Sequence, residues 1–178
     1  MKTEVLNFWF NEIDQKQWWV KQSEFDQIIR ERFSDIHASA NACELYKWRE
    51  SPEGRLAEII VLDQFSRNIF RDTPAAFASD TLALALAQEA IAVGDDLRLN
   101  ELQKIFLYMP FMHSESLKIH NVAIELFRNN CPESNLNFEI RHRDIIEKYG
   151  RYPHRNCILG RTSTEEEIAF LKQAGSSF

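Results

Sequence analysis

The segment from Pro52 to Phe70 constrains the fold more than any other part of the chain, because it predicts a helix that is apolar on nearly every side. Ser51 is a favourable N-cap residue, and a proline suits the first helical position, where no backbone N–H is needed. With residues placed 100° apart, apolar stripes lie on opposite sides of this helix. Their members are Leu56, Ile59, Ile60 and Phe70 on one side and Leu62, Phe65 and Ile69 on the other. A helix of this kind is buried, so other elements must surround it.

The surrounding elements are expected to be helices. Glycine makes up 5 of 178 residues, below its usual share of about 7%, which disfavours the many tight turns of an all-β fold. Apolar residues recur instead at helical spacing along most of the chain. We therefore expect an all-α protein in which antiparallel helices are joined by short loops. The further predicted helices are Val5–Phe10, one or two between Trp18 and Trp48, Asp80–Val93 up to Gly94, Glu101–Met109 up to a stop at Pro110, Ser114–Asn129 with Ser114 as its cap, Phe138–Tyr149 up to Gly150, and a last helix behind a capping box of Ser163 and Glu166.

Length and charge limit the classes of function. A chain of 178 residues without a linker rich in Pro, Gly or Ser predicts a single domain over residues 1–178. Its 27 acidic residues against 21 Lys and Arg give a net charge of −6, which is unsuited to binding nucleic acid. No apolar run approaches the roughly 20 residues of a membrane span, so no membrane partner is expected.

The cysteines and the N-terminus favour a cytoplasmic protein. The chain begins with no secretory signal. Cys43, Cys131 and Cys157 are odd in number and lack the spacing of a zinc or redox motif, as expected of unpaired thiols in a reducing compartment. The sequence also contains no glycine-rich phosphate loop, no His-Glu-x-x-His pair and no nucleophile elbow. We therefore expect neither a metal nor a cofactor.

Charged residues interrupt the apolar surface of the Pro52–Phe70 helix. Asp63 and Arg67 fall in the middle of one stripe, four residues apart with the acid first, which is the favoured order for a helical ion pair. Burying such a pair is weak evidence for added stability, so two interpretations are open. Either the pair locks the register of the helices, or both residues line a pocket whose wall extends to Asn68.

Histidines interrupt the helix predicted after Ser114 in a similar way. His120 falls on its apolar stripe and is most simply interpreted as a hydrogen-bonded core residue. His113 precedes the helix and is better placed to face a cleft, with Glu115 close behind it. The two histidines are seven residues apart, about 10.5 Å along a helix, so one metal ion cannot join them.

A basic loop is the third unusual feature. From Arg141 to Arg161, six basic residues stand against two acidic ones, a local charge of +4 in a chain of −6. A guanidinium group donates two parallel hydrogen bonds to a carboxylate or phosphate, and a histidine can transfer a proton near neutral pH. The loop either binds an anion or neutralises helix ends and acidic helices. Its central candidates are Arg151, His154, Arg155, Asn156 and Arg161.

Five strings carry a resemblance to a known family: VLNFWF, WW followed by FDQIIRERF, GRLAEIIVLDQFSRNIFRDTPAAFASD, YMPFMHSESLKIH and GRYPHRNCILGRTSTEEE. Over essentially the whole chain, the sequence resembles the bacterial domain of unknown function 924 family. The resemblance implies a bacterial, all-helical protein with a tetratricopeptide-repeat-like fold and no established activity. The motifs of the family fall on Leu62–Asn68, His113–Glu115 and Tyr152–Arg161. The sequence departs from the family's pattern with Ser66 for proline, Cys43 for glycine and His120 for glutamine.

A first hypothesis is that these polar residues converge on a pocket for a small anionic molecule. Whether such a pocket only binds or also catalyses stays open. Catalysis would use His154 or His113 as acid or base, oriented by Asp63 or Glu115. The ligand-binding residues would be Arg67, Asn68, Arg151, Arg155, Asn156 and Arg161.

A second hypothesis is that the stacked helix pairs form a scaffold that binds a peptide or protein partner in an exposed groove. The arginine and histidine cluster would then be structural. The oligomeric state is left open, with a homo-oligomer among the alternatives. Convergence of Asp63, Arg67, His113 and the Arg151–Asn156 loop on one partly open cavity would favour the first hypothesis over the second.

Overall fold

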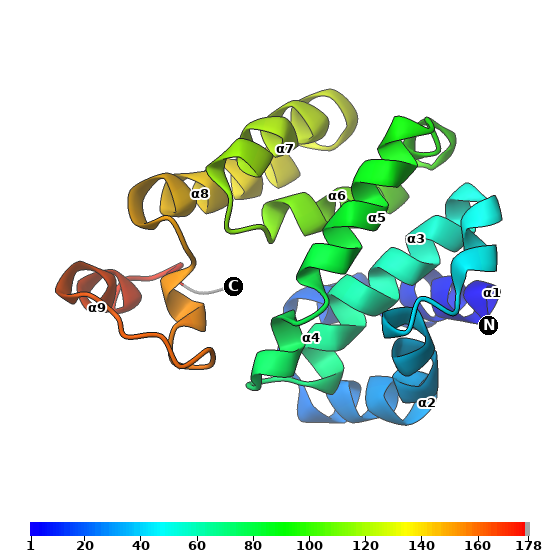
Figure 1. Cartoon of the computed structure of the whole chain (residues 1–178), viewed down its shortest axis with the longest axis horizontal. Coiled ribbons are helices and arrows are strands. Elements are labelled where there is room, and N and C mark those ends of the chain that lie inside the picture. The colour runs from blue at the N-terminus through cyan, green and yellow to red at the C-terminus, as the bar shows by residue number, and fades with distance from the viewer. Residues whose placement is uncertain (177–178) are drawn as a thin grey trace.

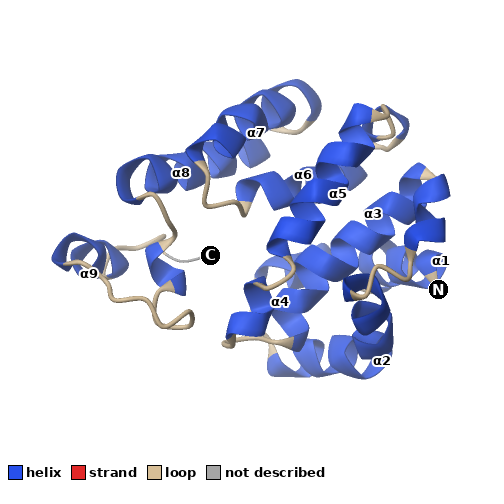
Figure 2. Cartoon of the chain, in the orientation of Figure 1, coloured by secondary structure: helices blue, strands red, loops and turns tan. Residues whose placement is uncertain are grey.

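The structure is a computed structural model that describes residues 1–176. Across that range the regular elements are helices, and no strand is present (Figure 2). The predicted all-α class is therefore confirmed, while the tetratricopeptide-repeat-like stacking stays a prediction. The α-helices are α1 Lys2–Asn7, α2 Ser23–Asn41, α3 Pro52–Ile60, α4 Ser66–Ile69, α5 Asp80–Ala92, α6 Glu101–Met112, α7 Leu117–Asn130, α8 Glu133–Tyr149 and α9 Glu165–Leu171.

The helix predicted from Pro52 onward is present and lies in the core. α3 continues through a π-helical turn, Val61–Phe65, into α4, so helical structure runs without a break to Ile69. The Ser51 hydroxyl caps the helix by accepting a hydrogen bond from the Gly54 N–H at 3.2 Å. Both predicted apolar stripes are buried except for Phe70, which is partly buried. Their fully buried members are Leu56, Ile59, Ile60, Leu62 and Phe65.

The π-helical turn positions the charge that the sequence places in the core. A π turn adds one residue to a helical turn and is often found at functional sites. This one packs against α2 and also contacts α5. Asp63 lies in the middle of the turn and has no exposed surface. The carboxylate is therefore surrounded by protein and needs partners on neighbouring elements.

α6 is the central helix in the second half of the chain. α5 and α7 both pack against α6, and α8 packs against α7 (Figure 1). After α8 the chain turns at Gly150, which has a φ of 69° and therefore suits glycine. A short 3-10 turn, Pro153–Arg155, follows before α9. This return brings the basic loop to the C-terminal end of α6, where Arg155 donates a hydrogen bond to the backbone of His113.

The predicted stop of α6 at Pro110 is wrong. The helix continues through the proline to Met112. Pro110 lies in the last turn, where it removes one backbone hydrogen bond rather than interrupting a long ladder. Phe111 and Met112 are buried in the core, and their packing favours the remaining turn.

The predicted start of α7 is displaced as well. Ser114 is not its cap, because Ser116 occupies the N-cap position and the helix begins at Leu117. α8 begins at Glu133, earlier than the predicted start at Phe138. Serines two residues apart are equally good caps, so the sequence alone does not choose between them.

The capping box of α9 is shifted by one residue. Thr164 and Glu167 form it, rather than Ser163 and Glu166. The hydroxyl of Ser163 instead accepts a hydrogen bond from the amide of Asn156 at 3.0 Å. α9 therefore begins close to the predicted position, but the capping residues are Thr164 and Glu167.

Within residues 1–176, none of the helices combines the length and the apolar character that crossing a bilayer requires.

Candidate functional site

A cavity of about 290 Å³ lies where the start of α5, the end of α6 and the basic loop meet. One part of its lining is apolar and includes Phe77, Leu84 and Leu159. The other part brings together candidates from separate regions of the sequence. The polar lining residues are Asp80, Thr81, His113, Ser114, Glu115 and Arg155.

The buried carboxylate of Asp63 is joined to this cavity through His113. The His113 Nδ1 lies 2.7 Å from Asp63 Oδ1. Arg67 donates to the backbone carbonyl of Asp63 at 2.6 Å and lies 3.3 Å from Oδ1. The Gln64 amide donates to Oδ2 at 2.5 Å. Asp63 is therefore fully engaged, and His113 is its only partner here that lines the cavity, within the part of the chain that the structure describes.

The protonation states of Asp63 and His113 follow from the groups around them. Burial would raise the pKa of Asp63, but the charge of Arg67 and the contact with His113 hold that pKa well below its usual range. Burial and the charge of Arg67 lower the pKa of His113 more than Asp63 raises it. Asp63 is thus ionised and His113 neutral near pH 7. The imidazole then donates its Nδ1–H to Asp63 and keeps a lone pair on Nε2.

Two arginines share the carboxylate of Asp80. Arg67 donates to both oxygens of Asp80, at 2.9 and 3.1 Å. Arg155 donates to Oδ2 at 3.3 Å and to the backbone carbonyl of His113 at 3.0 Å. Its guanidinium lies 4.6 Å from the ring centres of both Phe77 and Tyr152. These contacts hold Arg155 rigidly at the cavity wall, with a side chain that is 7% exposed.

The cluster of two aspartates and two arginines has no net charge, but the negative charge near Arg155 does not fully compensate its guanidinium. Asp63 and Asp80 together match the charges of Arg67 and Arg155. Burial and the neighbouring charge of Arg67 nevertheless lower the pKa of Arg155. Its Nε is also buried without an acceptor among the described residues. A negative group placed beside Arg155 would therefore be stabilised.

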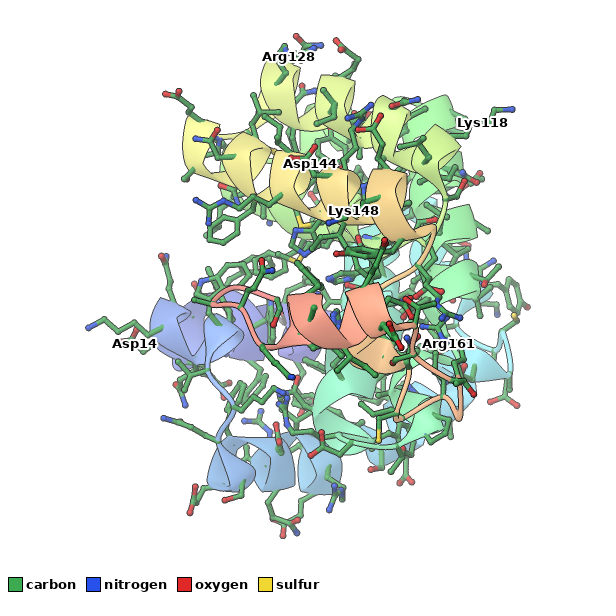
Figure 3. All side chains as sticks on the ribbon, turned by 90° about the vertical axis from the view of Figure 1, so that its left-hand side faces the viewer. Asp14, Lys118, Arg128, Asp144, Lys148 and Arg161 are labelled. Atoms are coloured by element: carbon green, nitrogen blue, oxygen red, sulfur yellow. The ribbon has the colours of Figure 1, made fainter. Side chains whose placement is uncertain are left out.

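Glu115 lines the cavity but is already held by other groups. Arg161 donates to both of its oxygens, at 2.6 and 2.9 Å, and the Tyr152 N–H donates at 2.8 Å. Burial would raise the pKa of Glu115, but Arg161 and the Tyr152 N–H lower it below its usual value. The carboxylate therefore fastens the basic loop to the segment after α6. Figure 3 shows Arg161 beside α9, in the part of the loop that makes this contact.

Other residues expected at the site do not line the cavity. Arg151 forms a bidentate ion pair with Glu167 at 2.7 and 2.8 Å, on the α9 side of the loop. The amide of Asn156 also binds Glu167. Asn68 donates to Asp26 on α2. These side chains serve the packing of the loop and of α4.

His154 lies next to the cavity wall rather than in it. Its ring centre is 5.6 Å from that of Tyr152. Burial and the charge of Arg155 lower its pKa to about 3, so it is neutral at pH 7. Of the histidines proposed as acid or base, His113 is the one that lines the cavity.

His120 matches its interpretation as a core histidine. It has no exposed surface. Its Nδ1 lies 2.6 Å from Glu139, and its Nε2 lies 2.8 Å from the Ser114 carbonyl and 3.1 Å from the Tyr152 hydroxyl. Both ring nitrogens of His120 are therefore engaged, and the residue has a structural role next to the cavity.

Asp80, Phe77 and Tyr152 are cavity or support residues that sequence reasoning did not single out. Asp80 follows Ser79 at the start of α5, where an acidic residue is already explained by the helix dipole. Phe77 and Tyr152 enclose the guanidinium of Arg155, a contact that local sequence patterns do not reveal. The available signal was that each lies within or beside a string that carries the family resemblance.

No group of His, Cys, Asp and Glu side chains within residues 1–176 is arranged to hold a metal ion.

Comparisons with known proteins agree with the whole-chain resemblance. The family described as "Bacterial protein of unknown function (DUF924)" matches residues 5–175. Among solved structures, the chain is similar to a protein of unknown function from Agrobacterium tumefaciens, with 38% sequence identity, a TM-score of 0.91 and 96% of each chain covered. None of the curated proteins matches the chain significantly.

Proposed function

Because the chain belongs to the DUF924 family, whose description names no activity, we propose a function from the geometry of its cavity: it binds a small monoanionic molecule, on which His113 acts as a base. One observation carries the proposal. A neutral imidazole, held by a buried carboxylate at 2.7 Å, lines the same cavity as a buried guanidinium.

The charge of the site favours an anion of low charge. Arg155 is the cationic side chain among the residues that line the cavity, while the carboxylates of Asp80 and Glu115 line it as well. A ligand with one negative charge can approach Arg155 without bringing a second charge against these carboxylates. A dianion such as a phosphate monoester would be repelled by them about twice as strongly as a monoanion.

The role of His113 follows from its fixed tautomer. Asp63 accepts the Nδ1–H and thereby orients the ring, so that Nε2 is the basic atom. Since its pKa is lowered, His113 stays unprotonated near pH 7 and can accept a proton or a hydrogen bond from a ligand. Asp63 does not touch the cavity and is a positioning residue.

The test is thermal stabilisation by a panel of small carboxylates, followed by titration calorimetry on those that stabilise. Arg155→Lys keeps the charge but loses the planar fork and its stacking, so we expect affinity to fall about tenfold or more. His113→Gln removes the basic imidazole nitrogen and should weaken the binding of carboxylates that carry a hydroxyl donor by about threefold to tenfold.

Arg151→Lys is the matched control, because Arg151 lies in the same loop but binds Glu167 away from the cavity. It should leave the affinity unchanged. The proposal is wrong if no small carboxylate stabilises the wild-type protein, or if Arg155→Lys and Arg151→Lys bind a stabilising carboxylate equally well while both remain folded by circular dichroism.

A further inference from the structure

A second hollow of about 190 Å³ lies farther along the same helices. Its lining is almost entirely apolar and comes from α5, α6 and α7. The residues are Gln88, Ile91, Phe111, Ile119, Val122 and Leu126. Nothing in the proposed function uses this surface.

The linings of the two hollows follow one another along the same helices. On α5, Thr81 and Leu84 line the cavity, and Gln88 and Ile91 line the second hollow. These positions are three or four residues apart, so they follow one face of the helix. α6 contributes Pro110 to the cavity and the adjacent residue to the hollow.

The opposite wall shows the same continuity. Glu115 lines the cavity just before α7, and Ile119, Val122 and Leu126 line the hollow with helical spacing. α5 and α7 each pack against α6. We therefore treat the two hollows as one groove, with α6 as its floor and α5 and α7 as its walls.

The groove has a polar end and an apolar end. The side chains of Leu84, Ile91, Ile119 and Leu126 are only partly buried, and Val122 is 46% exposed. Apolar side chains that face one another across a groove leave surface that a ligand can remove from water. The polar end of the groove contains His113 and the guanidinium of Arg155.

We propose that this groove binds a monocarboxylate with a medium-length acyl chain, with the carboxylate beside Arg155 and the chain between α5 and α7. This inference rests on the proposed function and names its ligand class. Volumes of about 290 and about 190 Å³ together fall within the range of roughly 300–1,000 Å³ that is typical of small-ligand sites.

An acyl chain fits the apolar end better than a peptide does. A peptide carries a backbone N–H and C=O at nearly every residue, and each needs a partner when it is buried. The amide of Gln88 is the polar side-chain group that this end offers. A hydrocarbon chain needs no such partners. The single carboxylate matches the one lining cation, Arg155.

The experiment is calorimetric titration of the full chain with butanoate, hexanoate, octanoate and decanoate below their micelle concentrations, with decanol as the uncharged comparison. We expect affinity to rise by up to about fourfold for each added methylene until the hollow is filled. Decanol should bind at least tenfold more weakly than decanoate, because it lacks the charge that Arg155 receives.

Val122→Gln places a polar group in the apolar end, and Val93→Gln is its matched control. Val93 is 54% exposed near the end of α5 and lines neither hollow. The ratio of decanoate to butanoate affinity should fall about fivefold or more in Val122→Gln and stay unchanged in Val93→Gln.

The outcomes separate the inference from the proposed function. Equal affinities along the series, or equal effects of the two valine variants, would overturn the groove and leave the binding of small carboxylates intact. Decanol binding as tightly as decanoate would also overturn it. No binding of any carboxylate would overturn both the groove and the proposed function.

Discussion

Two buried aspartates, Asp26 and Asp63, have similar partners but different surroundings. Asp26 on α2 forms a bidentate ion pair with Arg71 and accepts a hydrogen bond from Asn68 at 2.8 Å. The side chain of Arg71, just after α4, is 23% exposed, so this cluster reaches the solvent. Neither Asp26 nor its partners line the cavity or the hollow.

Asp63 has three partner side chains, against two for Asp26, and one of the three, His113, has a second polar atom. His113 binds Asp63 through Nδ1 and is also part of the cavity lining. A buried charge by itself therefore indicates no site, since both aspartates are buried. What connects a carboxylate to a ligand is a partner with hydrogen-bonding atoms on opposite sides.

The largest expected effect is the loss of the Asp63 charge. Asp63→Asn leaves Arg67 with one buried partner fewer and His113 without its acceptor, so the free energy of unfolding should fall by about 3–5 kcal/mol. Asp26→Asn is the matched substitution and should lower it by about 1.5–3 kcal/mol, because Arg71 can turn to solvent. Urea denaturation at pH 7.5 measures both. A smaller loss for Asp63→Asn than for Asp26→Asn would contradict the comparison.

A change in pH should have an intermediate effect on the free energy of unfolding. Burial lowers the pKa of His113 below its unfolded value of about 6.5, so the unfolded chain takes up its proton first. Stability due to neutral His113 is therefore complete above about pH 6.5 and declines as the pH falls below that value. His142 and His154, with pKa values of about 3, act in the same direction.

This decline is measured by urea denaturation between pH 7.5 and 5. Each proton taken up only by the unfolded state contributes a slope of about 1.4 kcal/mol per pH unit. His113→Gln should make the decline shallower, and Asp26→Asn should leave it unchanged, because no histidine contacts that cluster among the described hydrogen bonds. An identical slope in wild type and His113→Gln would show that this imidazole is not buried as a neutral group.

The smallest effect is expected at Ser66, beside the π turn. Its hydroxyl lies 2.7 Å from His37 Nε2 and donates to the Leu62 carbonyl at 2.5 Å. Ser66→Ala should lower the free energy of unfolding by about 1 kcal/mol, because the His37 N–H loses its acceptor. Ligand-induced thermal stabilisation should be unchanged, since Ser66 lines neither hollow. Loss of carboxylate binding in this variant would mean that the two clusters are coupled.

Much of the fold could be predicted because local patterns decide it. Ser51 and Pro52 favour a helix start through local capping alone, and Gly150 ends a helix because its φ is positive. The burial of Asp63 followed from apolar neighbours at helical spacing. The continuation of α6 through Pro110 could not be predicted in this way, because it depends on the tertiary packing of Phe111 and Met112.

The site was predicted less completely, because its decisive contacts are remote in sequence. Arg151 and Arg155 are equivalent by local composition, yet one binds Glu167 and the other lies between Phe77 and Tyr152. Their separate roles depend on which distant side chains each one meets. No periodicity within the loop carries that information.

Asp63, Asp80, His113 and Arg155 come from four separate stretches of the chain, with 50 residues between the first and third and 75 between the second and fourth. The contacts of Arg155 form only when the loop after α8 has returned to α6. A ligand held by all of them therefore recognises only a completely closed chain, and its binding would selectively stabilise finished molecules over partly folded ones.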